Sequence, residues 1–551
     1  MTHKKRLILF SFLLLGGVLR FTNLAGKPLW LDEIITGLFT FGQGYQVIPR
    51  ETVFSIQDIP SFFTYHSQSC SVIADTLAKQ STHPPLFFCL MHQWLSITQS
   101  LNIFDTSLGI QLRSLPAILG VISILLLYHL NRKAFSENAG LVAASVMAVS
   151  PFAVYLSQEA RQYTLLLILI TIALFALVQL LKPPRNSLPY WLLWGIANSL
   201  GCYTHYFFFL GLTAQIIILF FFFLWESPKR LLFLFSFTIG IILSYLPWVP
   251  TVIAHFSSAK TDWLPSVDLF SPIYQLLLGF LVMVVAFPVE QQSMLIQILS
   301  GIGMLSFGGW ILYQVRRRYG YLLQSKATRK ATLALSLYLG LLLLQFLFII
   351  YGLEKNIAIA PRYNYVYYPA VCALFGAILT AKTQSSQKLA ANQTKRFQLI
   401  QLSQPKWLVG FVGLLSSLFV VSNLFFLKPY LPEVTAQRFN QFSEPNLIAM
   451  GYKDDMDLAL GLSYGLALNR IRDDSLTSKF IFLNRNQGYD QIWNQIRQLP
   501  LNVSNIWVIG TGLKQVAFPE QLYLNQTKNC QRDRANYYRI GIPYQRYTCE
   551  E

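Results

Sequence analysis

Long apolar runs recur along the first 430 residues and are separated by short polar segments. A bilayer core of about 30 Å takes roughly 20 helical residues, because each residue of an α-helix rises about 1.5 Å. The pattern therefore predicts a polytopic α-helical membrane protein with about eleven transmembrane helices. These predicted spans lie near residues 7–23, 114–131, 139–156, 163–181, 190–204, 207–225, 230–249, 293–315, 332–352, 365–381 and 407–427.

Basic residues between the spans predict the orientation of the chain. With the N-terminus in the cytoplasm, the inner segments carry 20 basic residues and the outer segments before residue 428 carry about nine. The inner set comprises Lys4 to Arg6, Arg132, Lys133, Lys182, Arg185, Lys229, Arg230, the cluster Arg316 to Lys330 and a linker at 382–406. This asymmetry follows the positive-inside rule, so residues 24–113 and the C-terminal region are expected outside the plasma (inner) membrane.

One apolar stretch, Phe270 to Val289, does not fit this alternation. If it crossed the membrane, the basic cluster that begins at Arg316 would emerge on the outer side. It is therefore expected to be a re-entrant or interfacial helix.

The composition changes after residue 428, which divides a transmembrane domain (1–428) from a small domain (429–551). Short β-rich runs there alternate with helical stretches near 455–468 and 488–498, which predicts an extracytoplasmic α/β domain. The runs are Phe480–Leu483, Asn505–Ile509 and Tyr537–Ile542. The triplet Gly510-Thr511-Gly512 is too short for a nucleotide-binding fingerprint and is expected to be a turn.

Charged residues make up only 12% of the chain, whereas soluble proteins carry about 25%, and the mean hydropathy is +0.43. This composition excludes a soluble enzyme, a disordered protein and a disulfide scaffold. The net charge of +18 arises mostly beside the spans, so it is a topology signal and predicts the lipid bilayer rather than nucleic acid as a partner. Almost no charge falls inside a span, which argues against a lipid flippase or transporter.

The six cysteines fall into three groups. Cys89, Cys202 and Cys372 lie in apolar helices and are expected to be buried hydrophobic residues. Cys530 and Cys549 share the outer tail, where an oxidising environment favours a disulfide worth roughly 3 kcal/mol for a loop of about 20 residues. Cys70 has no obvious partner.

Unusual residues gather just beyond the outer ends of the spans. The first outer loop, 24–113, opens with Trp30-Leu31-Asp32-Glu33. Two adjacent carboxylates near lipid are partly desolvated, so one can act as a base while the other binds or orients. The competing interpretation is an acidic helix start that satisfies the helix dipole.

The same loop continues with Thr82-His83-Pro84-Pro85-Leu86 and an amphipathic stretch, Phe87 to Ile97, that is expected to lie along the outer interface. His83 can bond an acidic partner or a substrate phosphate, or it can be a helix cap. Arg113 stands at the outer mouth of the second span, where an interfacial anchor would be ordinary.

A second outer segment carries Tyr155, Gln158, Glu159, Arg161 and Tyr163, and a third carries Pro361-Arg362-Tyr363. Each arginine alone is typical of a membrane anchor. Arginines from three outer loops, with Arg113 as the third, can also converge on a phosphate, because a guanidinium offers a bidentate fork to its oxygens.

The order of these motifs resembles the bacterial glycosyltransferase family 39 proteins, relatives of the protein O-mannosyltransferases and the lipid A aminoarabinose transferase. The resemblance rests on Trp-Leu-Asp-Glu, His-Pro-Pro-Leu, Arg-Ser-Leu-Pro-Ala, Ser-Pro-Phe with Tyr-Leu-Ser-Gln-Glu-Ala-Arg-Gln-Tyr, Tyr203-Thr204-His205-Tyr206 and Pro361-Arg362-Tyr363. It is strong over residues 1–210 and fades in the C-terminal domain.

The resemblance implies a GT-C fold and the transfer of a sugar from a polyprenyl monophosphate to an acceptor on the outer face. We expect a single displacement with inversion, onto a hydroxyl of the acceptor. The resemblance makes Asp32 the catalytic base, with Glu33 beside it. The expected substrate-binding residues are His83, Arg113, Tyr155, Gln158, Glu159, Arg161, Tyr163, His205, Arg362 and Tyr363. No metal ion and no cofactor are expected. A surface-polysaccharide polymerase or ligase remains the alternative enzyme, and the sugar and the acceptor stay open.

Overall fold

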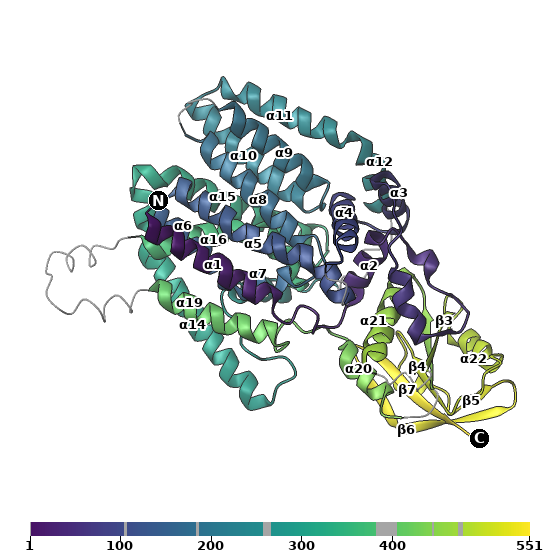
Figure 1. Ribbon diagram of the computed structural model, residues 1–551. Helices are drawn as coiled ribbons and strands as arrows, with labels where there is room; N and C mark the ends of the chain where they lie inside the picture. The colour runs from purple at the N-terminus through teal and green to yellow at the C-terminus, as the bar shows by residue number, and fades with distance from the viewer. Residues whose placement is uncertain are drawn as a thin grey trace. The chain divides into compact units, whose positions relative to one another are not determined.

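The computed structural model describes residues 2–103, 107–182, 187–256, 266–381, 405–442, 446–471 and 478–550. The chain divides into two compact units, each built from separate stretches of sequence (Figure 1). The membrane unit comprises Met1–Leu24, Leu77–Phe87 and Arg113–Phe426, and the sheet unit comprises Ala25–Thr76, Phe88–Leu112 and Leu427–Glu551. The predicted linker 382–406 lies outside the described residues apart from its last two, as does Arg185.

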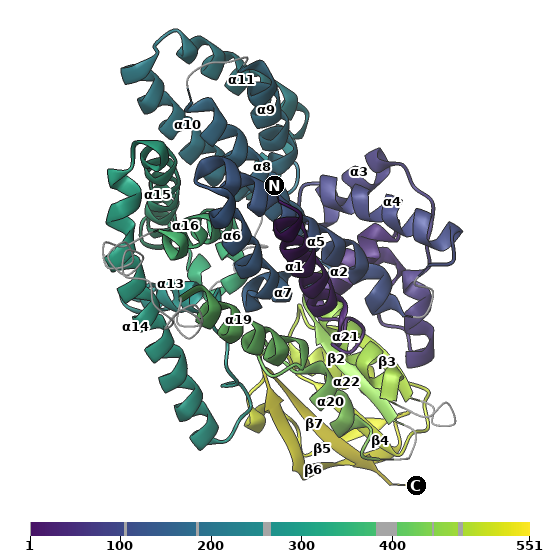
Figure 2. The same cartoon turned by 60° about the vertical axis from the view of Figure 1, so that its left-hand side comes forward.

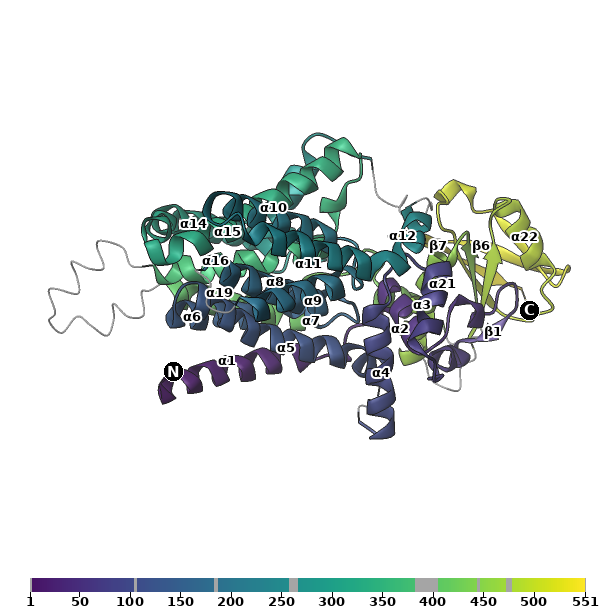
Figure 3. The ribbon, with the colours of Figure 1, turned by 90° about the horizontal axis from the view of Figure 1, so that it is seen from above.

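Helices make up most of the membrane unit. They are α1 (His3–Phe21), α5 (Leu108–Ala134), α6 (Glu137–Val149), α7 (Pro151–Ser157), α8 (Tyr163–Leu180), α9 (Leu188–Cys202), α10 (Phe208–Glu226), α11 (Arg230–Tyr245), α12 (Val249–Phe256), α13 (Ser271–Val282), α14 (Met294–Gln324), α15 (Lys326–Leu347), α16 (Tyr368–Thr380) and α19 (Pro405–Val421). Helix α8 packs against α9, α15 and α16 (Figure 2), and α1 packs against α6 (Figure 3).

Within the described residues, six helices are long and apolar enough to cross a bilayer. They are Leu108–Ala134, Tyr163–Leu180, Phe208–Glu226, Arg230–Phe256, Met294–Gln324 and Lys326–Gly352, and α6 with α7 makes a seventh if that bent pair is one span. The protein is therefore an integral membrane protein. The other predicted spans fall on α1, which has a basic start, and on α9, α16 and α19, which have 15, 13 and 17 residues.

Two local features follow directly from the sequence. The bend of 59° between α6 and α7 falls where Pro151 removes a backbone donor and the Ser150 hydroxyl accepts from the Ala153 amide at 3.3 Å. Helix α13 has 12 residues and rises about 18 Å, too little to cross the bilayer core alone.

Arg20, which belongs to none of the predicted motifs, ties α1 to α6 and α7. Its guanidinium is fully buried and donates to the Ser157 hydroxyl at 3.1 Å and to the Met147 and Ala148 carbonyls at 2.9 and 3.1 Å. This contact needs Gly120 of α5, because a Cβ there would clash with the Ser157 hydroxyl.

The sheet unit contains a seven-stranded sheet in the order β1-β3-β2-β4-β7-β6-β5. Its strands are β1 (Phe54–Ser55), β2 (Asn446–Tyr452), β3 (Ser478–Asn484), β4 (Asn505–Ile509), β5 (Gln521–Leu524), β6 (Lys528–Ile540) and β7 (Ile542–Cys549). Strands β3, β2 and β4 are parallel and the other pairs are antiparallel. The predicted α/β domain is confirmed, and Gly512, with φ +83, lies in the turn expected after β4.

Part of the first outer loop belongs to this sheet. Strand β1 pairs Phe54 with Phe480 of β3, and α2 (Leu31–Thr40) packs against α21 (Asp455–Ile471). The remaining helices of the unit's C-terminal part are α20 (Pro432–Phe439) and α22 (Tyr489–Arg497). The loop and the tail therefore form one compact unit, whereas the division at residue 428 stays a prediction.

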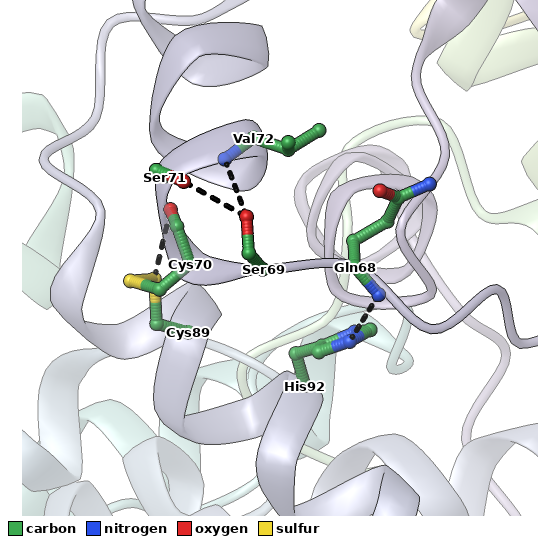
Figure 4. The surroundings of a disulfide bond; sticks show 7 residues. All are labelled: Gln68, Ser69, Cys70, Ser71, Val72, Cys89 and His92. Atoms are coloured by element: carbon green, nitrogen blue, oxygen red, sulfur yellow. Dashed lines mark hydrogen bonds between the residues drawn. A yellow bond between two sulfur atoms is a disulfide. The ribbon is translucent and has the colours of Figure 1, made fainter.

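The disulfides confirm one expectation and correct another. Cys530 and Cys549 are bonded across β6 and β7, as predicted. Cys70, at the start of α3 (Cys70–Gln80), is bonded to Cys89 in the first turn of α4 (Leu86–Ser100), so Cys89 is not a free buried thiol (Figure 4). That prediction was wrong because apolar surroundings do not distinguish a buried thiol from a buried disulfide. Cys202 and Cys372 are free and buried, as expected.

Candidate active site

Six of the predicted site residues come together in the membrane unit. His83 lies between α3 and α4, and Arg161 lies in the short loop between α7 and α8. His205 lies between α9 and α10, and Arg362 belongs to the 3-10 turn η7 (Pro361–Val366) before α16. Tyr163 and Tyr363 follow the two arginines along the chain. We call this set, with its tyrosines, the histidine–arginine cluster.

The imidazole ring of His83 makes two hydrogen bonds. Its Nε2 atom is 2.8 Å from Nη2 of Arg161, and its Nδ1 atom is 2.9 Å from the Ser81 hydroxyl. Burial lowers the pKa of His83 well below its ordinary value, and the charges of Arg161 and Arg362 lower it further. The imidazole is therefore neutral at physiological pH.

His205 is neutral for the same reasons. Burial, with Arg161 and Arg362 nearby, lowers its pKa to about 3. Its Nδ1 atom accepts a hydrogen bond from the Phe207 amide at 3.1 Å, so the ring proton resides on Nε2, which can donate to an anion.

Aromatic rings surround these polar groups. The guanidinium carbon of Arg161 is 6.0 Å from the ring centre of Tyr163, and that of Arg362 is 5.5 Å from that of Tyr363. The His205 ring lies 5.4 Å from Tyr365, a fully buried residue that the sequence reasoning missed. Tyr365 lies two residues after Tyr363 in the same turn, and this spacing is the feature of the sequence that could have indicated it as a site residue.

Two hydrogen bonds to backbone carbonyls hold the segment that carries His83. Nε2 of His255 donates to the Ala78 carbonyl at 3.1 Å, while the Tyr206 hydroxyl donates to Nδ1 of the same ring at 2.7 Å. The Leu86 amide donates to the Tyr203 carbonyl at 3.1 Å. Ser81 and His255 are thus further members of the site that the motifs did not reveal.

Three other predicted residues support the ends of helices. Nη1 of Arg113 donates to the Leu24 carbonyl at 2.8 Å, and Nε2 of Gln158 donates to the Thr22 carbonyl at 2.9 Å, so both fix the chain just after α1. Tyr155 stacks on Phe426 with ring centres 4.2 Å apart.

Glu159 is 4% exposed, and its carbonyl accepts from the Arg161 amide at 2.7 Å. Through this backbone contact it shapes the turn that presents Arg161.

The acidic pair begins α2 in the sheet unit. Glu33 is fully buried, and its carboxylate accepts from the Trp30 amide at 3.4 Å, as the helix-start interpretation expects. Asp32 is 9% exposed. The Leu31 amide donates to the hydroxyl of Tyr430 at 2.5 Å. Burial raises the pKa of Tyr430, and the two carboxylates raise it further.

An apolar pocket of about 310 Å³ opens within the membrane unit. Leu278 and Val282 of α13, Met304 of α14, Ala358 and Pro361 are among the residues that line it. Pro361 is the residue before Arg362, so an apolar space adjoins the turn that carries a guanidinium. Among the described residues, no group of three or more His, Cys, Asp or Glu side chains is arranged to hold a metal ion.

Residues 82–253 match the family described as dolichyl-phosphate-mannose-protein mannosyltransferase. Over these residues, which make up less than half of the chain, the protein is similar to that family of lipid-linked-sugar-dependent glycosyltransferases. The resemblance drawn from the motifs is therefore confirmed. Comparison with curated protein sequences gives no match.

Two crystal structures of ArnT from Cupriavidus metallidurans share the fold of this chain. With the form bound to undecaprenyl phosphate the TM-score is 0.52, and with the apo form it is 0.51. In both comparisons the identity is 12%, and the alignment covers 98% of this chain and 97% of ArnT. The predicted GT-C fold is thus shown.

Proposed function

We propose that this glycosyltransferase moves a sugar from a polyprenyl monophosphate donor to an acceptor hydroxyl on the outer face of the membrane, with inversion at the anomeric carbon. The observation that carries the proposal is the histidine–arginine cluster. In this largely buried site, Arg161 and Arg362 lie near two histidines that burial and the two positive charges keep neutral. Such a site offers positive charge and hydrogen-bond donors to a phosphate without a charged histidine.

The donor is amphiphilic, and the membrane unit offers both of the surfaces that it needs. The two guanidinium groups suit the phosphate, and the Nε2 proton of His205 adds a neutral donor. The apolar pocket beside Pro361 suits the first part of an isoprenoid chain. Tyr163 and Tyr363 offer ring faces and hydroxyls to the sugar.

The reaction is a single displacement. The acceptor oxygen attacks the anomeric carbon, and the bond from that carbon to the phosphate oxygen breaks with its electron pair on the phosphate. Arg161 and Arg362 stabilise the negative charge that grows there. Asp32 takes the proton of the acceptor hydroxyl, while Glu33 holds the start of α2 in place.

The remaining candidates have positioning roles in this proposal. Arg113 and Gln158 hold the segment between α1 and α2, and Tyr155 and Glu159 shape the approach to Arg161. The proposed membrane topology has eleven spans, with the N-terminus in the cytoplasm and the sheet unit outside the plasma membrane. A periplasmic reporter fused after Glu551 should be active. An inactive reporter would contradict the odd number of spans.

The decisive experiment measures release of undecaprenyl monophosphate from a radiolabelled sugar donor by purified protein in the presence of cell-envelope acceptors. The proposal expects release in step with appearance of label in the acceptor. Transfer that proceeds only from diphosphate donors, with no release of monophosphate, would contradict it. Mass spectrometry of the lipid that co-purifies with the protein identifies the donor to use.

A further inference from the structure

Ser81 is a buried polar residue beside the histidine–arginine cluster for which the transfer reaction above gives no role. It follows α3, it is only 6% exposed, and its amide donates to the Leu77 carbonyl at 2.9 Å. Its hydroxyl lies 2.9 Å from Nδ1 of His83. It therefore touches a histidine of the cluster whose ring is hydrogen-bonded to Arg161.

The direction of these hydrogen bonds follows from the chemistry of the partners. A guanidinium can only donate, so Nε2 of His83 must present its lone pair to Arg161. A neutral imidazole carries one ring proton, which is then on Nδ1 and is donated to the Ser81 hydroxyl. The chain of contacts thus runs from Ser81 through His83 to Arg161.

We propose that Ser81 is a positioning residue that holds His83 in its Nδ1-protonated tautomer, so that Nε2 fixes the guanidinium of Arg161 for the donor's phosphate. Without the hydroxyl, the other tautomer would turn an N–H group toward the N–H groups of Arg161. Two donors would then face each other, and the guanidinium would lose its orientation. The phosphate part of this inference rests on the proposed function.

Ser81 controls the tautomer and not the charge of His83. Burial is the largest cause that opposes protonation of His83, and the charges of Arg161, His205, His255 and Arg362 also oppose it. The pKa of His83 therefore lies well below its ordinary value. The choice between two neutral forms is then left to the hydrogen-bond partners of the ring.

The test uses full-length protein in lipid nanodiscs, with histidine labelled by ¹⁵N in the ring. The two ring nitrogens of a neutral histidine give separate signals that report which one carries the proton, and His83→Gln identifies those of His83. The unaltered protein should show the Nδ1-protonated form, and Ser81→Ala should show a mixture. Ser81→Thr keeps a hydroxyl and should restore the single form, whereas Ser71→Ala, an exposed position in α3, should change nothing.

The functional measurement is the affinity for undecaprenyl monophosphate. Ser81→Ala should raise the Kd about fivefold, the effect of one ordinary hydrogen bond, with KM rising and kcat little changed. A single tautomer in Ser81→Ala would overturn the proposal, and so would a mixture of tautomers with an unchanged Kd.

Failure of the proposed function gives a different result. If the unaltered protein neither binds undecaprenyl monophosphate nor transfers sugar, while Ser81→Ala still mixes the tautomers, the phosphate role falls. The control of His83 by Ser81 then stands by itself.

Discussion

The histidine–arginine cluster and the acidic helix start of α2 differ in charge and in how they are built. The cluster joins four loops at the ends of apolar helices, and burial keeps its histidines neutral beside two guanidinium groups. The acidic pair sits on one helix of the sheet unit, where Glu33 caps the helix and Tyr430 accepts from its first amide. The guanidinium groups of the cluster favour binding of an anion, whereas the carboxylates of the acidic pair can accept a proton.

Under the proposed function, this difference separates the two tasks of a glycosyl transfer. A leaving phosphate needs fixed positive charge in a site that excludes water. An acceptor hydroxyl needs a carboxylate that can take its proton. Each task has its own structural support, so variants in one region should change a different kinetic constant from variants in the other.

The largest effect is expected for Asp32→Asn. An amide cannot accept the acceptor's proton, so turnover should fall by roughly two or more orders of magnitude while expression and donor affinity stay the same. Initial rates at saturating donor measure this change. Asp75→Asn, at an exposed position of the same unit, is the matched control. Normal turnover in Asp32→Asn would remove the residue from the base role.

Arg161→Gln should act on binding rather than on proton transfer. A lost charge-assisted hydrogen bond to phosphate costs roughly 1.5–3 kcal/mol, so the Kd for undecaprenyl monophosphate should rise about tenfold to about a hundredfold. Equilibrium binding measures the change. Arg50→Gln breaks an exposed ion pair with Asp455 and should leave this Kd as it is. An equal rise of the Kd in both variants would mean that the overall positive charge of the protein, and not the cluster, determines the affinity for the donor.

The disulfide between Cys70 and Cys89 should contribute to stability. Its sequence separation of 19 corresponds to roughly 3 kcal/mol of loop-closure entropy. Replacing both cysteines by serine should therefore lower the Tm in nanodiscs by several degrees, and mild reduction of the unaltered protein should do the same. Cys202→Ser changes a free cysteine and serves as a control for the substitution itself. An unchanged Tm after complete reduction would argue against this contribution.

The stability of the protein should also depend on pH. The pKa of His205 is about 3 in the folded protein and about 6.5 in an unfolded chain. Below about pH 6.5 the unfolded chain binds a proton that the folded protein does not, so the free energy of unfolding should fall as the pH is lowered. His83 acts in the same direction.

Thermal unfolding between about pH 7.5 and about pH 5 checks this prediction. A variant with His83→Gln and His205→Gln should show a flatter dependence than the unaltered protein, whereas His3→Gln, at an exposed position, should not. Identical slopes in all three proteins would show that other groups govern the pH dependence.

The apolar runs by themselves determined that the chain is a polytopic membrane protein, because the length of a helix that crosses a bilayer is set by geometry. The ordered motifs indicated the resemblance to a glycosyltransferase family, and the change in composition after residue 428 indicated an α/β domain. These properties are local or depend on the order of residues, so they can be predicted without knowing which segments meet.

Only the tertiary structure decided which residues share a site. Ser81, His255 and Tyr365 belong to no recognisable motif, and they join the cluster through contacts that depend on the folded chain. It also paired Cys70 with Cys89 and placed β1 beside β3. Hydrogen bonds, disulfides and strand pairing depend on distances in space, and spacing along the chain does not specify those distances once several helices and strands intervene.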